Sequence, residues 1–252
     1  SILSHLKSFQ LDKSKSIEIT PTGINEFDDL NRTVSHLTER STKVYLQQKE
    51  FIENASHELQ TPLAIFQIKL DTLMQHAGLS EKEATTIMEL EESVQRMTRL
   101  NKNLLLLSKI ENEQFTDREP VPLAELIQSL MANLQAITDG LAIDLDLQPF
   151  TVNANRTLTE IMLTNLFHNA IRYTPPGGQI SVRLAGNVLT VSNHGDALAI
   201  SPEKIFERFQ KGSGSSNGTG LGLAIVRKIC DTCAYGLTYK YEKGAHIFSV
   251  HF

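Results

Sequence analysis

The feature that most constrains this chain is a long run of apolar residues spaced alternately four and three apart. The positions of this seam are Leu30, Val34, Leu37, Ser41, Val44, Gln48, Phe51 and Ala55, with polar residues at two of them. A heptad spacing places one stripe along a helix, and that stripe must pack against another helix. An amphipathic helix packed on its own domain is the alternative. A seam of this length favours a partner helix, most simply from a second copy of the chain.

The seam leads directly into a segment that carries a histidine, residues 51–63, with the sequence FIENASHELQTPL. His57 and Thr61 share one helix face, and Glu58 lies beside the histidine. Pro62 lacks an N–H and its ring clashes with the carbonyl four residues back, so we expect a bend just after His57. An imidazole with a carboxylate neighbour can accept and release a group near neutral pH. Taken alone, the segment fits a surface histidine on an amphipathic helix better.

Two motifs in the second half of the chain are chemically complementary to that histidine. Residues 165–174, NLFHNAIRYT, place Asn165, Asn169, Arg172 and Tyr173 on neighbouring turns of a helix. Residues 218–226, GTGLGLAIV, put glycines at the start of an apolar helix, where backbone N–H groups can approach phosphates. The glycine spacing is not that of a Rossmann fingerprint, and no lysine follows as a P-loop requires.

Together, these motifs resemble the boxes of a two-component sensor histidine kinase. Residues 57–62 are similar to the H box of the HisKA type, residues 165–174 to the N box, residues 205–209 to the F box and residues 218–222 to the G2 box. Their order and spacing match the family from about residue 23 to residue 252. The resemblance implies a multidomain fold: an all-α dimeric helical hairpin, forming a four-helix bundle, followed by an α/β sandwich of the GHKL (Bergerat) ATPase type.

We therefore expect three parts in the chain. Residues 1–45 are a HAMP-like remnant and signalling helix, residues 46–117 the dimerisation and histidine phosphotransfer domain, and residues 118–252 the catalytic ATP-binding domain. A turn near Gly78 separates the two hairpin helices, and Ser80 with Glu83 forms a capping box for the second. A junction at residues 120–122 precedes helices over 123–137 and 157–172 and strands over 141–147, 180–184, 188–192, 236–241 and 247–252.

For the reaction, the resemblance implies that His57 accepts a phosphoryl group from ATP. Glu58 acts as general base or orients the ring, and Thr61 occupies the position of the family's phosphatase residue. Asn169 coordinates Mg²⁺, a hard ion suited to an amide oxygen and phosphate oxygens. The residues implied to line the nucleotide are Asn165, His168, Asn169, Arg172, Tyr173, Asn193, Gly195, Lys211, Gly218, Thr219, Gly220, Leu221 and Gly222.

One segment departs from the family. Where the G1 box usually reads Asp-x-Gly-x-Gly, this chain has Asn193-His194-Gly195-Asp196-Ala197. The family aspartate accepts a hydrogen bond from the adenine amino group. Asparagine can accept through its carbonyl oxygen but without charge, and a charge-assisted bond is stronger by about 1 kcal/mol. We therefore expect weaker nucleotide binding, while Ala197 restricts the backbone beside the pocket.

Composition limits the remaining partners. A net charge of −5 gives no electrostatic footprint for nucleic acid. The sequence contains no run of about 18 apolar residues, so we expect none of its segments to span a membrane. The pair Cys230 and Cys233 provides too few ligands for a structural zinc site and fits reduced thiols in the cytosol. Since the chain begins without methionine, we expect a cytoplasmic fragment of an inner-membrane protein whose membrane and sensor segments lie upstream.

Three functions fit these observations. The first is a kinase that autophosphorylates His57 and passes the group to the receiver domain of a response regulator, with phosphatase activity in reverse. The second is a nucleotide-binding pseudokinase that acts as a phosphatase or scaffold, which Asn193 and Ala197 favour. The third is a chaperone- or topoisomerase-like ATPase of the same fold, which the His57 helix argues against.

Overall fold

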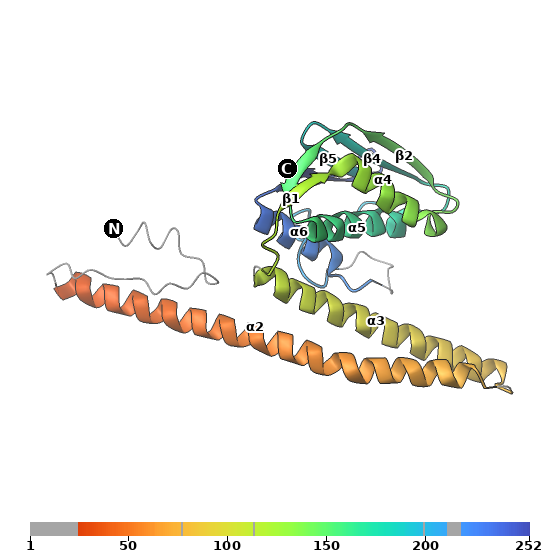
Figure 1. Cartoon of the computed structure of the whole chain (residues 1–252), viewed down its shortest axis with the longest axis horizontal. Helices are drawn as coiled ribbons and strands as arrows, with labels where there is room; N and C mark the ends of the chain where they lie inside the picture. Colours follow the sequence, from red (N-terminus) through yellow and green to blue (C-terminus); the bar gives the residue numbers. More distant parts are fainter. Residues whose placement is uncertain (1–24, 77, 113, 199, 211–217) are drawn as a thin grey trace.

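The computed structural model describes residues 25–76, 78–112, 114–198, 200–210 and 218–252. Its first part is a hairpin of two long helices, α2 (Asn25–Met74) and α3 (Glu81–Glu111), which run antiparallel (Figure 1). α2 is continuous through Pro62, and Figure 1 shows gentle curvature along it and no break. Pro62 and Glu58 are both exposed, so water can satisfy the carbonyl that the proline leaves without a donor. Among the described helices, none has an apolar stretch long enough to cross a bilayer.

The hairpin has only a small core of its own. Leu63 and Leu70 from α2 pack with Ile87 and Val94 from α3. Ser80 caps α3, and its hydroxyl and backbone N–H form the reciprocal bonds of a capping box with Glu83, as the sequence predicts. The apolar seam of α2 remains uncovered in the single chain, with Leu30, Leu37, Val44 and Phe51 exposed by 56–72%.

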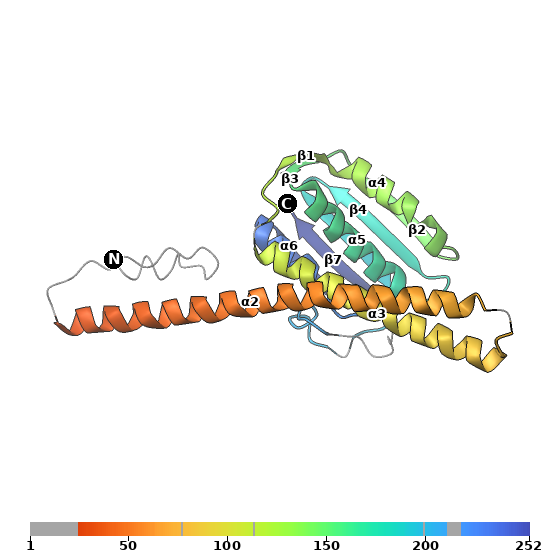
Figure 2. The same ribbon diagram turned by 60° about the horizontal axis from the view of Figure 1, so that its bottom comes forward.

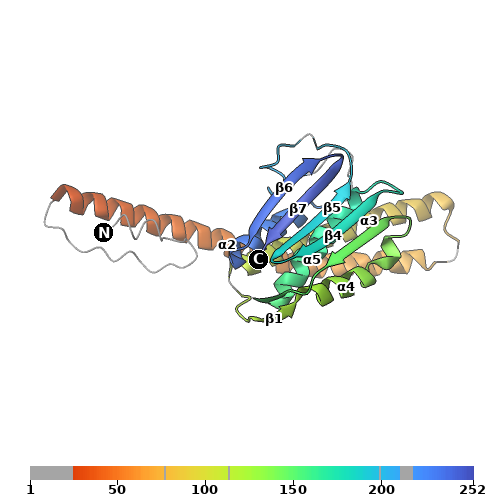
Figure 3. The same cartoon turned by 90° about the horizontal axis from the view of Figure 1, so that it is seen from above.

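The second part is an α/β sandwich, so the expected combination of a helical hairpin and a sandwich is confirmed. Its strands follow the order β2-β4-β5-β7-β6, in which β2 and β4 are parallel and the other neighbours antiparallel. The helices cover one face of the sheet (Figure 2). Figure 3 shows the opposite face, which the helices leave uncovered. The bounds are β2 (Ala142–Leu147), β4 (Gln179–Ala185), β5 (Val188–His194), β6 (Gly236–Glu242), β7 (Ala245–His251), α4 (Leu123–Asn133), α5 (Arg156–Tyr173) and α6 (Gly222–Cys233).

Two details differ from the sequence-based expectation. The predicted junction at residues 120–122 lies in a strand, β1 (Glu119–Pro122), which pairs with β3 (Thr151–Ala154) as a separate two-stranded sheet. A two-stranded ribbon consists only of edges, where prolines are tolerated. The helix expected over residues 123–137 ends at Asn133 and continues as a short 3-10 turn, η1 (Gln135–Ile137).

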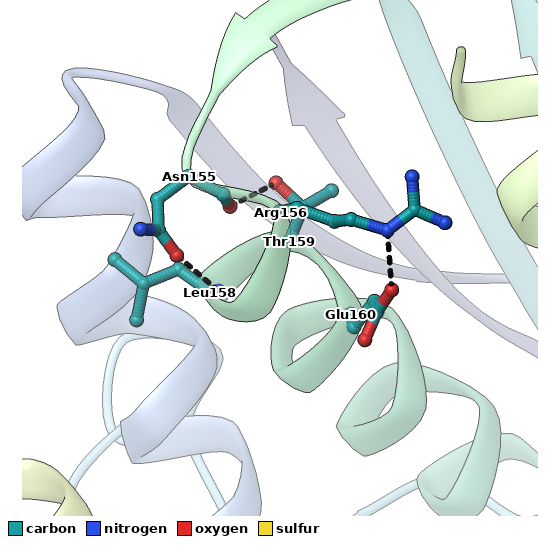
Figure 4. Close-up of polar contacts among 5 residues, drawn as sticks. All are labelled: Asn155, Arg156, Leu158, Thr159 and Glu160. Carbon is teal, nitrogen blue, oxygen red and sulfur yellow. Dashed lines mark hydrogen bonds and ion pairs between the residues drawn. The ribbon is translucent and has the colours of Figure 1, made fainter. Parts of the chain in front are cut away.

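Asn155 caps the start of α5, as Figure 4 shows. The Asn155 side chain accepts a hydrogen bond from Leu158 N at 3.0 Å, and its backbone oxygen accepts one from Thr159 Oγ1 at 2.9 Å. Arg156 and Glu160 add an ion pair one turn apart, with Nε and Oε1 3.0 Å apart. This N-cap fixes the start of the helix that carries the asparagine motif.

The core of the sandwich extends into the hairpin. Leu107 and Ile110, from the last turns of α3, are 2% and 1% exposed and belong to the same apolar cluster as the sheet and its helices. Cys230 is part of this core, with its Sγ 3.7 Å from Met162 Sδ, and burial raises its pKa to about 12. Both cysteines are free thiols, and a thiol with so high a pKa is unreactive at neutral pH.

Candidate functional site

A cavity of about 390 Å³ lies where α5, α6, β5 and β7 meet and is closed on one side by α3. Sequence segments that are far apart converge here: the asparagine helix, the glycine-rich segment and Asn193, which stands where the family usually has aspartate. The lining residues that the sequence analysis named are Asn165, His168, Asn169, Arg172, Tyr173, Asn193, Gly218, Thr219, Gly220 and Gly222.

The asparagine helix and the glycine segment fit each other closely. A Cβ on Gly222 would lie 2.9 Å from Asn165 Oδ1, which leaves no room for a side chain at the start of α6. The side chain of Asn165 is fixed by a hydrogen bond, since its Nδ2 donates to Ile161 O at 2.8 Å. α6 therefore begins at a residue without a side chain beside the cavity, which leaves room for backbone N–H groups at its start to approach an anion.

Gly220 holds the segment that precedes α6. Its φ of +71° lies in the left-handed region, and a Cβ there would lie 2.8 Å from the Phe209 backbone. Its carbonyl accepts a hydrogen bond from Phe209 N at 2.8 Å. Phe209 itself has a φ of +64°, which is strained for a residue with a side chain. This contact joins two described residues on either side of the segment 211–217, which itself lies outside the described residues.

Asn193 forms a buried end of the cavity. It is 1% exposed, and its Nδ2 donates to His194 O at 3.2 Å. Its Oδ1 has no partner among the described residues. A buried carbonyl oxygen without a donor is costly, so this atom is suited to accept a hydrogen bond from a ligand.

His246 lies opposite Asn193 on the neighbouring strand β7 and also lines the cavity. Its ring is fixed at both nitrogens, by Tyr239 Oη at 2.8 Å and by Asp196 O at 3.0 Å. Burial lowers its pKa, although Asp196 acts in the opposite direction. The sequence analysis missed this residue, and no motif marks it; only the strand register brings it beside Asn193.

The electrostatics of the cavity favour an anion. Its lining includes Arg99, Lys102 and Arg172, and no carboxylate is among the described lining residues. Partial burial, and secondly the charge of Arg172, lower the pKa of His168. The part of the chain that the structure describes also has no cluster of three His, Cys, Asp or Glu side chains for a metal. A hard cation here would need oxygens from an amide such as Asn169 and from its ligand.

Three lining residues come from the hairpin and were not anticipated: Arg99, Lys102 and Asn103 of α3. Asn103 Nδ2 donates to Thr219 Oγ1 at 3.3 Å, which joins α3 to the glycine segment. α6 packs against α3, so the sandwich rests on the second helix of the hairpin (Figure 1). Sequence analysis had no signal for this, since the two parts are more than one hundred residues apart.

The remaining predicted site residues lie elsewhere. His57, Glu58 and Thr61 are exposed on α2, and none of them lines the cavity. Next to His57, the buried Ser56 accepts a hydrogen bond from Asn101 Nδ2 at 2.6 Å, which fixes this turn of α2 against α3. Figure 1 shows α3 between α2 and the sandwich.

Two of the predicted nucleotide contacts that the structure describes are not part of the lining. Leu221 is fully buried in the core, so only its backbone is available. Gly195 lies just behind the cavity wall, where a Cβ would meet the His246 ring at 3.1 Å. Lys211 lies outside the described residues.

Comparison with known families divides the chain at the same place as its architecture. A family model described as the His Kinase A (phospho-acceptor) domain matches residues 47–113. A second, described as Histidine kinase-, DNA gyrase B-, and HSP90-like ATPase, matches residues 154–252. The first contains His57, and the second contains every lining residue of the cavity outside α3.

Two curated sensor proteins are similar to most of this chain. The heme sensor protein HssS of Staphylococcus saprophyticus is 34% identical over 206 residues, covering 79% of this chain and 45% of the relative. The sensor protein QseC of Salmonella typhi is 32% identical over 233 residues, covering 88% of this chain and 50% of the relative. The chain therefore spans about half the length of the curated relatives it matches.

Solved structures agree on the fold. The Acinetobacter baumannii histidine kinase AdeS matches with a TM-score of 0.52 at 25% identity, over 77% of this chain and 95% of that one. Full-length ShkA in complex with AMPPNP matches with a TM-score of 0.63 at 21% identity, over 80% of this chain and 45% of that one.

Proposed function

Because this chain belongs to the two-component sensor histidine kinases, we propose that it transfers the γ-phosphoryl group of ATP to His57 and then to an aspartate of a response regulator. One observation carries the proposal: the chain combines a solvent-exposed histidine with a cavity whose described lining contains no carboxylate and one buried acceptor without a partner among those residues. The histidine is open to attack a phosphoryl group, and the cavity suits an amino-bearing base with a polyphosphate.

In the nucleotide site, the adenine amino group donates to Asn193 Oδ1, the acceptor that has no partner among the described residues. The start of α6 at Gly222 and the side chains of Asn165 and Arg172 face the phosphates. Asn169 would hold Mg²⁺ through its amide oxygen, and the ion would neutralise phosphate charge there. Tyr173 and His168 complete the wall on the side of α5.

In the first chemical step, a ring nitrogen of His57 attacks the γ-phosphorus in line. The N–P bond forms as the bond from the γ-phosphorus to the β,γ-bridging oxygen breaks, and ADP leaves. Glu58, next along α2, orients the imidazole and takes up its proton. His57 does not line the cavity, and α3 lies between α2 and the sandwich (Figure 1), so the sandwich has to leave α3 to reach this imidazole.

In the second step, an aspartate of a receiver domain takes the phosphoryl group from the imidazole. Thr61 lies one turn from His57 on the exposed surface of α2. There it can orient a water molecule for hydrolysis of the regulator's phosphoaspartate, which would make the chain a phosphatase as well.

The proposed assembly is a homodimer through the hairpin. The apolar side chains of α2 and α3 that remain exposed in the single chain include Leu30, Leu37, Phe51, Phe66, Met88 and Met97. A second hairpin would cover them in a four-helix bundle. In each chain of this dimer, the proposed signalling, phosphotransfer and catalytic parts are residues 1–45, 46–117 and 118–252. They are proposed to be the cytoplasmic portion of a membrane-anchored sensor.

A pseudokinase that acts as phosphatase or scaffold is the second candidate. It is favoured by Asn193, which offers the base a neutral acceptor where a carboxylate would bind more strongly. Ala197 departs from the family at the same box.

Incubation of the purified chain with γ-labelled ATP separates the two candidates. The kinase acquires an acid-labile, alkali-stable label that passes to an added receiver domain. ATP binding in calorimetry without label at any Mg²⁺ concentration would identify the pseudokinase. ATP turnover that survives loss of His57 would instead support an ATPase.

A further inference from the structure

Three polar residues of α3 face the nucleotide cavity although they belong to the other domain. Arg99, Lys102 and Asn103 are three and four residues apart, so they share one helix face. Both cations are otherwise exposed, and the helix needs neither of them for its own packing. Packing within the hairpin therefore does not account for the position of Arg99 and Lys102 at the cavity.

The docking of α3 at this position has several anchors. Asn103 Nδ2 donates to Thr219 Oγ1, within the glycine segment. One and two turns further along, Leu107 and Ile110 are buried in the core of the sandwich. At the end of the helix, Glu111 Oε1 lies 2.6 Å from Arg208 Nη2. Arg99 and Lys102 are therefore held at the cavity by contacts that do not involve their own charges.

These two charges lack compensation. Among the described residues, neither Arg99 nor Lys102 forms an ion pair, and no carboxylate lines the cavity that they face. Arg172 adds a third positive charge from the opposite wall. Like charges around one cavity repel each other, and an anion with several charges would relieve that repulsion.

We propose that Arg99 and Lys102 contact the polyphosphate of the bound nucleotide, so that α3 forms a second cationic wall of the nucleotide site. This inference rests on the proposed function, because it assigns further residues to the same ligand. ATP then links the sandwich to the hairpin: its base is held by Asn193 and its phosphates by both domains. By linkage, ATP strengthens docking on α3 by the same factor by which docking strengthens ATP binding.

The test is nucleotide affinity in the full chain, measured by calorimetry with ATP and with adenosine. The test variant is Arg99→Gln/Lys102→Gln, and the matched control is Lys82→Gln/Arg96→Gln. The control removes two exposed charges from the same helix, but neither residue lines the cavity. All four positions are exposed, so both variants should fold, which circular dichroism melting verifies.

The expected result is ATP binding weakened by about tenfold or more in the test variant and by less than about twofold in the control. Adenosine affinity should be equal in all three proteins, because only phosphate contacts are lost. The conservative variant Arg99→Lys/Lys102→Arg should keep most of the ATP affinity, since it retains both charges.

The inference is overturned if the test variant binds ATP as the control does, or if it loses adenosine affinity to the same extent. In either case a wild-type chain that binds ATP leaves the proposed function intact. A wild-type chain that binds no ATP contradicts the proposed function itself, and the inference with it.

Discussion

Arg208 Nη2 lies 2.6 Å from Glu111 Oε1, and this ion pair joins the loop before α6 to the last turn of α3. Glu111 is 17% exposed at its side chain and Arg208 is 44% exposed, so solvent screens only part of the attraction. The pair lies beside the buried Leu107 and Ile110. It therefore marks the contact between the sandwich and the end of α3, in an arrangement in which His57 does not line the cavity.

Reversing one charge of this pair should loosen the docking. Arg208→Glu places two carboxylates together, and we expect a larger radius of gyration in small-angle scattering. The double variant Glu111→Arg/Arg208→Glu should return to the wild-type value because it restores opposite charges. Arg227→Glu is the control, since Arg227 pairs with Asp231 inside α6. Equal expansion in the control would contradict the assignment.

Asn193→Asp should have opposite effects on the empty and the loaded protein. A carboxylate at a position that is 1% exposed is poorly solvated, so the free energy of unfolding without nucleotide should fall. A charged acceptor should bind the adenine amino group more strongly, and ATP affinity should rise about fivefold.

Thermal unfolding with and without ATP measures both effects of this substitution. Asn153→Asp, on the exposed side of β3, is the matched control and should change neither quantity. Unchanged or weaker ATP binding in Asn193→Asp would show that Asn193 does not contact the base.

Gly220→Ala should weaken ATP binding beyond its cost in stability. The new alanine has to adopt a positive φ, and its Cβ would lie 2.8 Å from the Phe209 backbone, so the glycine segment must shift. Gly140→Ala is the control because its φ of +79° imposes the same strain while its surroundings are open. Both variants should lose about 1 kcal/mol of unfolding free energy or more. Equal ATP affinities in the two variants would contradict a role for Gly220 in shaping the cavity.

His168 should make both stability and ATP binding depend on pH. Its pKa is lowered by partial burial and by Arg172, so the unfolded chain binds the proton first as the pH falls. The stability that the neutral ring contributes is present above 6.5 and is lost as the pH falls below that value. Phosphates favour the imidazolium, so ATP binding should take up protons at mildly acidic pH, where the lowered pKa keeps the ring of the free protein neutral.

Calorimetry in two buffers of different ionisation enthalpy measures that proton uptake. His168→Asn should reduce it, whereas His76→Asn, in the exposed turn of the hairpin, should leave it unchanged. The difference between the proteins isolates His168 from the protons that ATP itself binds. Identical uptake in wild type and His168→Asn would rule out a phosphate contact.

Most of the fold was predictable because its signals are local. The capping box of Ser80 and Glu83 fixes the start of α3, and the alternation of residues 180–192 fixes the hairpin of β4 and β5. The strand β1 was missed because two prolines in four residues argue against a strand unless it lies at an edge.

The candidate site was predictable only where a motif marks it. Asn165, Asn169 and Gly220 belong to patterns that read clearly along the chain. His246 reaches the cavity through the pairing of β5 with β7, and Arg99 reaches it through the docking of α3. Neither contact leaves a trace in local spacing, because each depends on packing between distant segments. The uninterrupted path of α2 through Pro62 has a different origin, because exposure to water offsets the missing hydrogen bond.

The account depends most on delivery of the γ-phosphoryl group to one imidazole. The decisive measurement compares γ-labelled with α-labelled ATP in wild type, in His57→Gln and in the control His76→Gln. We predict an acid-labile label from γ-labelled ATP alone, present in wild type and His76→Gln and absent in His57→Gln. Label that persists in His57→Gln, or that appears equally from α-labelled ATP, would contradict the account.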